Sequence, residues 1–153
     1  TTLFRSFAKT IYTIQTITNE ADIEVNFSAL PTIVFNEPYL ESIFLNLITN
    51  AIKYAKPNIR PHIKICSHLI NGKYCLQISD NGVGLNMARI EDKIFGLYQR
   101  FHSNEDSKGI GLYLVKSQIT ALGGTIGIES EENIGSTFTI CFNQEAQKNK
   151  RKN

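Results

Sequence analysis

Apolar and polar residues alternate over 62–70 and again over 73–80, and the dipeptide Asn71-Gly72 separates the two stretches. Alternation with a period of two is typical of β-strands that bury one face. Asn-Gly between two such stretches is a strong signal for a tight hairpin turn, because both central positions of that turn need a positive φ. Asp80 continues the apolar face of the return stretch. The sequence therefore predicts an antiparallel hairpin that ends in a carboxylate.

Periodicity and chain breaks predict the other elements. Helices are expected over 3–17, 37–55 and about 110–121, the second capped by Asn36, and further strands over 23–27, 32–35, 125–130 and 137–142. The strands come mostly in antiparallel pairs, with helices between the pairs. This order predicts an α+β fold: a two-layer sandwich with one mixed, mostly antiparallel sheet and helices on one face. A doubly wound fold would need strict alternation of strands and helices.

Length and charge limit the class of protein. The 153 residues suit one domain over 1–142, followed by a basic tail over 143–153 that is expected to be disordered. The tail holds four of the 16 basic residues, which leaves 12 basic and 13 acidic residues in the body. Nucleic-acid binding needs a basic face, so no nucleic-acid partner is predicted. No apolar run approaches the ~18 residues of a membrane span, so no direct membrane contact is predicted.

The termini and the cysteines indicate the context of the chain. Thr1 is preceded by neither methionine nor a leader, so the chain is expected to be cut from a longer protein. Cys66, Cys75 and Cys141 are odd in number and lack metal-ligand spacing. They are interpreted as buried thiols of a reduced compartment, which predicts a cytoplasmic domain.

Two asparagines break the pattern of the predicted helix over 37–55. Asn46 and Asn50 lie four residues apart on a shared face, and Lys53 follows one turn later. Asparagine is a poor residue for a helix interior, because its amide competes for backbone hydrogen bonds. Stacked amide oxygens above an ammonium group could bind a hard cation and a phosphate. A pair of solvated asparagines at the rim of the core is an equally good interpretation at this point.

Three glycine-rich turns are the other unusual segments. The first, DNGVGL over 80–85, contains alternate glycines that let the backbone approach a ligand closely. The second, Gly109-Ile110-Gly111, follows Lys108 and opens a helix, where free N–H groups favour an anion. The third covers 135–137. Each of these segments alone is equally consistent with an ordinary turn.

Taken in order, the segments resemble one family. FLNLITNAIKYA (44–55) is similar to an N box, KIFGLYQRF (93–101) to an F box, and DNGVGL, GIGLYLVK (109–116) and GSTF (135–138) to three glycine boxes. These are the motifs of the catalytic ATP-binding domain of bacterial sensor histidine kinases, whose Bergerat fold is shared with DNA gyrase. The resemblance covers about residues 3–142. It departs from the family at Ser107, where an earlier glycine is common, and in the short segment 102–108.

The resemblance implies ATP and Mg²⁺ as cofactors and a role for each motif residue. Asp80 would accept a hydrogen bond from the adenine amine, with Gly82 and Gly84 forming the wall behind the base. Asn46 and Asn50 would bind Mg²⁺. These two asparagines are expected to act in catalysis together with Lys53 and Arg100, the second of which would approach the γ-phosphate. Further nucleotide contacts are implied for Tyr54, Leu85, Phe95, Lys108, Gly109, Ile110, Gly111, Leu112 and Thr137, with Phe95 anchoring an ATP lid over 86–108 and Thr137 on the adenine side.

The implied activity is transfer of the ATP γ-phosphate to a histidine on a separate phosphoacceptor domain, in the same parent chain or in its dimer mate. A response regulator would act downstream, and the parent protein could be membrane-anchored. Hydrolysing relatives carry a glutamate where this chain has Asn46, so slow attack by water is expected here. His62, His68 and His102 are not expected to be the acceptor. An anti-sigma-type serine kinase and a degenerate nucleotide-binding module remain as alternatives.

Overall fold

A five-stranded sheet forms the centre of the computed structural model, which describes residues 3–15, 19–29, 33, 35–90, 94–95 and 111–145. The strands are β1 (Asp22–Asn26), β2 (His62–Ile70), β3 (Lys73–Asp80), β4 (Thr125–Glu131) and β5 (Gly135–Glu145), in the spatial order β1-β2-β3-β5-β4. β1 pairs with β2 in parallel, and the other three pairs are antiparallel. The sheet is therefore mixed and mostly antiparallel, as predicted.

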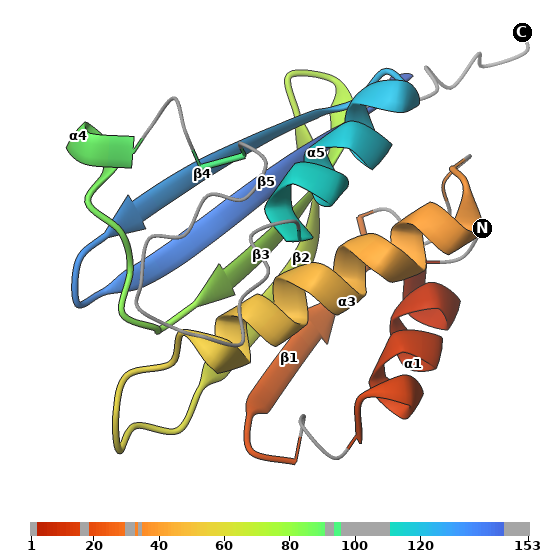
Figure 1. Cartoon of the computed structure of the whole chain (residues 1–153). Coiled ribbons are helices and arrows are strands. Elements are labelled where there is room, and N and C mark those ends of the chain that lie inside the picture. The colour runs from red at the N-terminus through yellow and green to blue at the C-terminus, as the bar shows by residue number, and fades with distance from the viewer. Residues whose placement is uncertain are drawn as a thin grey trace, which may run out of the picture.

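The long helices lie on one face of this sheet (Figure 1). They are α1 (Leu3–Thr13), α3 (Glu37–Lys53) and α5 (Gly111–Ala121), and a single turn, α4 (Met87–Ile90), lies near β4. The two-layer α+β sandwich predicted from the order of elements is confirmed. No helix in the described ranges is long and apolar enough to cross a membrane.

The core lies between the helices and the sheet. Its largest fully buried side chains come from α3, β2, β3 and β5 and include Leu40, Phe44, Leu47, Ile63, Ile65, Leu76, Ile78 and Phe142. Across β3 and β5, Leu76 is opposite Ile140 and Ile78 is opposite Phe138. Burying each such side chain contributes about 1.5–3 kcal/mol relative to leaving it exposed. The strand alternation seen in the sequence therefore fixes which face of the sheet the helices cover.

Local signals in the sequence explain how the elements begin and turn. Asn36 caps α3, since its side-chain oxygen accepts a hydrogen bond from the Tyr39 N–H at 2.9 Å. Asn71 and Gly72 have φ values of 52° and 77°, as a two-residue hairpin turn between β2 and β3 requires. Both predictions are confirmed.

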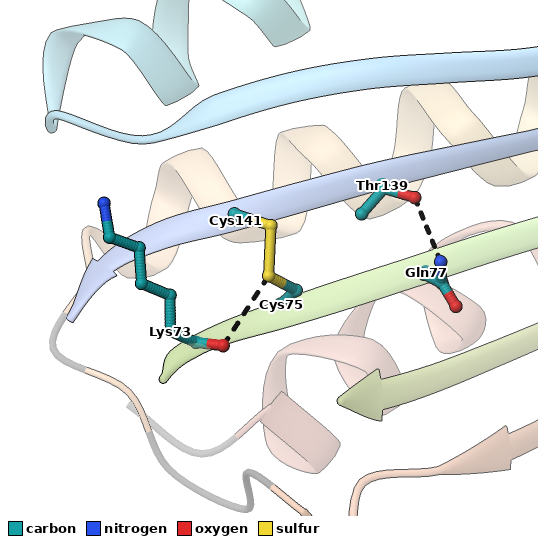
Figure 2. The surroundings of a disulfide bond; sticks show 5 residues. All are labelled: Lys73, Cys75, Gln77, Thr139 and Cys141. Atoms are coloured by element: carbon teal, nitrogen blue, oxygen red, sulfur yellow. Dashed lines mark hydrogen bonds between the residues drawn. A yellow bond between two sulfur atoms is a disulfide. The ribbon is translucent and has the colours of Figure 1, made fainter. Parts of the chain in front are cut away.

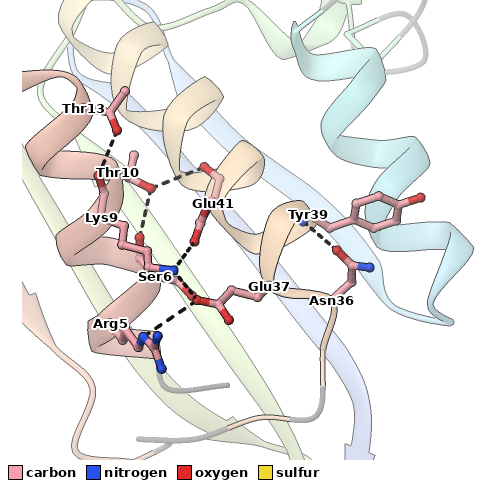
Figure 3. A network of polar contacts seen from close by, with 9 residues as sticks. All are labelled: Arg5, Ser6, Lys9, Thr10, Thr13, Asn36, Glu37, Tyr39 and Glu41. Atoms are coloured by element: carbon pink, nitrogen blue, oxygen red, sulfur yellow. Dashed lines mark hydrogen bonds and ion pairs between the residues drawn. The ribbon is translucent and has the colours of Figure 1, made fainter.

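Polar contacts join α1 to α3 at the edge of the helical layer (Figure 3). Lys9 Nζ lies 2.9 Å from Glu37 Oε1 and 3.5 Å from Glu41 Oε1. The Thr10 hydroxyl, which is buried, donates to the backbone oxygen of Ser6 at 3.0 Å. Exposed ion pairs of this kind contribute about 0–1 kcal/mol each, so the apolar contacts of the core remain the main source of stability.

The interpretation of all three cysteines as thiols is wrong for two of them. Cys75 of β3 and Cys141 of β5 are directly opposite each other in the register and form a disulfide bond (Figure 2). Cys66 is the one free cysteine in the described part of the chain, and it is half-buried. The pairing was hidden in the sequence because 66 positions separate the two partners.

Some predicted boundaries also differ from the structure. Ile33 and Phe35, the two described residues of the predicted strand over 32–35, belong to no strand, and Ile33 is buried in the core. β5 continues to Glu145, three residues beyond the predicted end of the domain, and residues 146–153 of the predicted tail lie outside the described residues. The turn of helix α4 lies inside the segment predicted as a lid.

Candidate functional site

Asp80 lies at the end of β3, on the face that the helices cover. Its Oδ1 accepts a hydrogen bond from the Gly82 backbone N–H at 2.8 Å. The backbone of Ser136, which is opposite Asp80 in the register of β5, provides a second hydrogen bond. Burial raises the pKa of the Asp80 carboxyl, and the two backbone hydrogen bonds oppose part of that rise. The arrangement gives a carboxylate that gains from a further hydrogen-bond donor.

The turn after Asp80 is held against its neighbours by backbone contacts. The Val83 N–H donates to the Tyr54 carbonyl at 2.9 Å, and the Val83 carbonyl accepts from the Asn133 N–H at 2.7 Å. A Cβ on Gly82 would lie 2.6 Å from the Tyr54 carbonyl oxygen and 2.9 Å from Asp80 Oδ1. The turn is therefore packed between the end of α3 and the β4–β5 loop, with no room for a side chain at this position.

Gly84 and Gly135 are required for a second reason. Both have positive φ, 66° and 140°. A Cβ on Gly84 would overlap the Glu131 carbonyl, and one on Gly135 would overlap the Asp80 carbonyl. The first and third glycine-rich turns of the sequence thus meet at the end of β3, beside Asp80.

Asn46 of α3 faces the start of α5. Its Nδ2 donates to the Ser42 carbonyl oxygen at 2.8 Å, and its Oδ1 lies 3.0 Å from the position that a Cβ on Gly111 would take. The hydrogen bond to Ser42 orients the amide so that its oxygen is directed toward α5. Asn50, one helical turn later, and Lys53 are both half-buried on the same helix. Amide oxygens are suitable ligands for Mg²⁺, so Asn46 and Asn50 fit that ion chemically, whereas the Lys53 ammonium suits a phosphate.

Of the remaining predicted residues, some are described by the structure and the others are not. Phe95 packs its ring against Phe138 of β5, with a centroid distance of 6.4 Å, and Leu112 packs against the core. Leu85 uses its backbone N–H to reach the Ser130 hydroxyl at 2.8 Å. Tyr54 contributes its backbone as the C-terminal cap of α3. Arg100, Lys108, Gly109 and Ile110 lie outside the described residues.

Thr137, which is predicted to contact the adenine side, lies beside Ser79 of β3. Its hydroxyl lies 3.0 Å from the Ser79 hydroxyl, on the face of the sheet away from Phe138 and the helices. Ser136 occupies the helix-facing position instead. The sequence contains a signal for this: Phe138, Ile140 and Phe142 are buried and alternate with Thr137, so Ser136 shares their face.

Comparisons with known proteins identify the fold and the family. The fold is that of a histidine kinase catalytic domain: a mycobacterial sensor histidine kinase, MprB, has a TM-score of 0.80 at 19% identity, covering 93% of this chain and 95% of that chain. The catalytic domain of the histidine kinase ThkA has a TM-score of 0.75 at 21% identity, with 93% and 92% coverage. Residues 35–146 match the family of histidine kinase-, DNA gyrase B- and HSP90-like ATPases, and the chain belongs to this family.

Curated relatives include a sensor protein and a histidine-protein kinase. The heme sensor protein HssS of Staphylococcus saprophyticus is 36% identical over 126 residues, which is 81% of this chain and 26% of that protein. The signal transduction histidine-protein kinase ArlS of Staphylococcus aureus is 37% identical over 109 residues, 67% of this chain and 23% of that protein. The chain thus spans about a quarter of the length of these two relatives and is homologous to their ATP-binding kinase domain.

Proposed function

We propose that this chain binds Mg²⁺-ATP at the site around Asp80 and Asn46 and transfers the γ-phosphate to a histidine on a separate phosphoacceptor domain. That domain would belong to the same parent chain or to its dimer mate, and a response regulator would receive the phosphate next. We assign the domain to the cytoplasm, where ATP is available. The observation that carries the proposal is the half-buried Asp80 carboxylate between two glycine-rich turns.

The environment of Asp80 suits an adenine base. A buried carboxylate is costly unless a donor satisfies it, and the exocyclic amine of adenine is such a donor. Gly82 and Gly84 let the turn pack closely against the carbonyls of Tyr54 and Glu131, which fixes the backbone beside the carboxylate. The amine of a flat base would then reach Asp80 without displacing a side chain of this turn. This pairing would favour adenine over a purine that lacks the amine.

The helical asparagines suit the phosphate end of the nucleotide. The Asn46 amide oxygen, oriented by Ser42 and close to Gly111, would hold Mg²⁺ together with Asn50. Lys53 would neutralise phosphate charge. Bound Mg²⁺ supplies charge neutralisation at the phosphates.

Asparagine at position 46 also favours transfer over hydrolysis. An amide cannot accept a proton as a general base, so Asn46 would not activate water. Phosphoryl transfer relies on alignment and charge stabilisation more than on acid–base chemistry from the protein. The γ-phosphate would therefore persist until an acceptor histidine approaches.

The test is phosphotransfer from ATP labelled at the γ-phosphate to the phosphoacceptor domain of the parent protein. We expect label that is lost in acid and stable in alkali, as for phosphohistidine, and strongly reduced labelling with Asp80→Ala. The exposed aspartate variant Asp22→Ala is the matched control and should label like the wild-type chain. Acid-stable label would indicate a serine kinase instead. ATP binding without any transfer would indicate a nucleotide-binding module and would overturn the proposal.

A further inference from the structure

Three neighbouring strands carry a polar residue where their apolar face ends. Asp80 of β3 is opposite Ser136 of β5, and Ser136 is opposite Ser130 of β4. Ser130 continues the face of β4 that carries the half-buried Ile126 and Ile128. Strand alternation predicts an apolar residue at such a position. The three polar side chains therefore form one row across the sheet, and Asp80 is its first member.

The Ser130 hydroxyl contacts two of the glycine-rich turns, those over 80–85 and 135–137. It accepts a hydrogen bond from the Leu85 N–H at 2.8 Å. It also lies 3.0 Å from the Gly135 carbonyl oxygen and 2.7 Å from the Ser136 hydroxyl. A hydroxyl has one proton and two lone pairs. Donation to Gly135 and acceptance from Leu85 and Ser136 use all three, so the hydroxyl is fully satisfied in this arrangement.

These contacts reach Asp80 from two sides. Leu85 ends the turn whose Gly82 N–H donates to the Asp80 carboxylate. Gly135 and Ser136 begin β5, and the backbone of Ser136 provides the second hydrogen bond to Asp80. Gly135 also packs so closely that a Cβ there would overlap the Asp80 carbonyl. One side chain thus ties together the two segments that donate to the carboxylate.

We propose that Ser130 is a positioning residue of the nucleotide site: its hydroxyl holds the two glycine-rich turns together, and so sets the direction of the Asp80 carboxylate toward the base. The inference rests on the proposed function and deepens it. It assigns part of the selectivity for a purine with a 6-amino group to a residue that does not touch the reacting atoms. Without the hydroxyl, the Leu85 N–H and the Gly135 carbonyl lose this partner. The turn over 80–85 is then still held to the β4–β5 loop by the Val83–Asn133 hydrogen bond but no longer at Leu85, so the two turns can shift relative to each other.

The test measures the dissociation constants of ATP and inosine triphosphate, which lacks the 6-amino group, by calorimetry. In Ser130→Ala we expect ATP to bind about tenfold more weakly and the preference for ATP over inosine triphosphate to fall by about fivefold. Ser130→Thr retains the hydroxyl and should restore both values. Ser130→Cys keeps the size but is a weak hydrogen-bonding group, so it should resemble Ser130→Ala even if the alanine variant folds poorly.

Ser79→Ala is the matched control. It removes a hydroxyl pair between the same strands, β3 and β5, on the opposite face of the sheet. We expect the nucleotide preference of this variant to equal that of the wild-type chain. Unchanged affinity and preference in both Ser130→Ala and Ser130→Cys would overturn the inference, as would an equal loss in Ser79→Ala. A wild-type chain that binds neither nucleotide would instead refute the proposed function.

Discussion

At the scale of single residues, the protonation of Asp80 links binding to pH. Burial raises the pKa of this carboxyl above its usual value, so the folded domain without nucleotide keeps the proton to a higher pH. The adenine amine needs the ionised form as its acceptor. ATP binding should therefore weaken as pH falls through the raised pKa, by up to about tenfold per pH unit below it. Calorimetric titrations between pH 4 and 8 measure this dependence.

Asp80→Asn is the control for that titration, because ATP itself also changes its charge in this range. The variant should lose the part of the pH dependence that belongs to the carboxyl; identical profiles in the two proteins would contradict the assignment. The effect on folding has the opposite sign. Since the folded pKa lies above the unfolded one, the contribution of Asp80 to stability is full below the unfolded pKa and is lost as pH rises through the folded pKa.

Comparing alanine substitutions at two glycines distinguishes the cost of backbone strain from the cost of steric crowding. Gly72 and Gly84 both have positive φ, but a Cβ on Gly72 would meet nothing within 4 Å, whereas one on Gly84 would overlap the Glu131 carbonyl. Gly72→Ala should lower the free energy of unfolding by about 1 kcal/mol. Gly84→Ala should lower it by about 3 kcal/mol, because the turn must also move. Urea unfolding of the two variants measures the difference, and equal losses would contradict the packing described here.

At the scale of elements, the Cys75–Cys141 disulfide links β3 to β5 in the parts of these strands that lie away from Asp80 and Ser136. Closing a loop across 66 positions restricts the unfolded chain, so reduction should lower the free energy of unfolding by about 2–4 kcal/mol. Denaturant curves with and without dithiothreitol test this. Cys66→Ser is the control and should show the same drop. Three reactive thiols in the unreduced, unfolded protein would show that the bond does not form.

The helices and strands, and the position of Asp80 in the site, could be predicted because they depend on local sequence pattern. Alternation predicted β2 and β3, and the same alternation placed Asp80 on the helix-facing side. Contacts that depend on register between distant strands could not be predicted in this way. The disulfide, the Asp80–Ser136 pair and the Ser130 contacts all need the alignment of β5 with β3 and β4. The face on which Thr137 lies depends on the same alignment, because a motif does not say which of two adjacent strand residues faces the helices.

At the scale of the whole molecule, the described residues include two separate surfaces at which a ligand could be sought. One is the end of the sheet around Asp80, where the C-terminal end of α3 meets the glycine-rich turns over 80–85 and 135–137. The other is a shallow groove on α1 and α3, lined by Arg5, Ala8, Lys9, Tyr12, Thr13 and Glu41. The two surfaces have no lining residue in common. We propose that ATP binds at the first surface, because there, among the described residues, the half-buried Asp80 carboxylate faces backbone donors and glycines.

The most direct measurement is a titration of the ¹⁵N-labelled chain with Mg²⁺-ATP, followed by nuclear magnetic resonance. We expect the largest chemical-shift changes at the backbone amides of Gly82, Gly111 and Ser136 and at the side-chain amide of Asn46. Asp80→Ala should remove these changes while the remaining signals stay those of a folded protein. Changes confined to the groove on α1 and α3, or unchanged signals at Gly82 and Ser136 in a chain that binds ATP, would contradict the site.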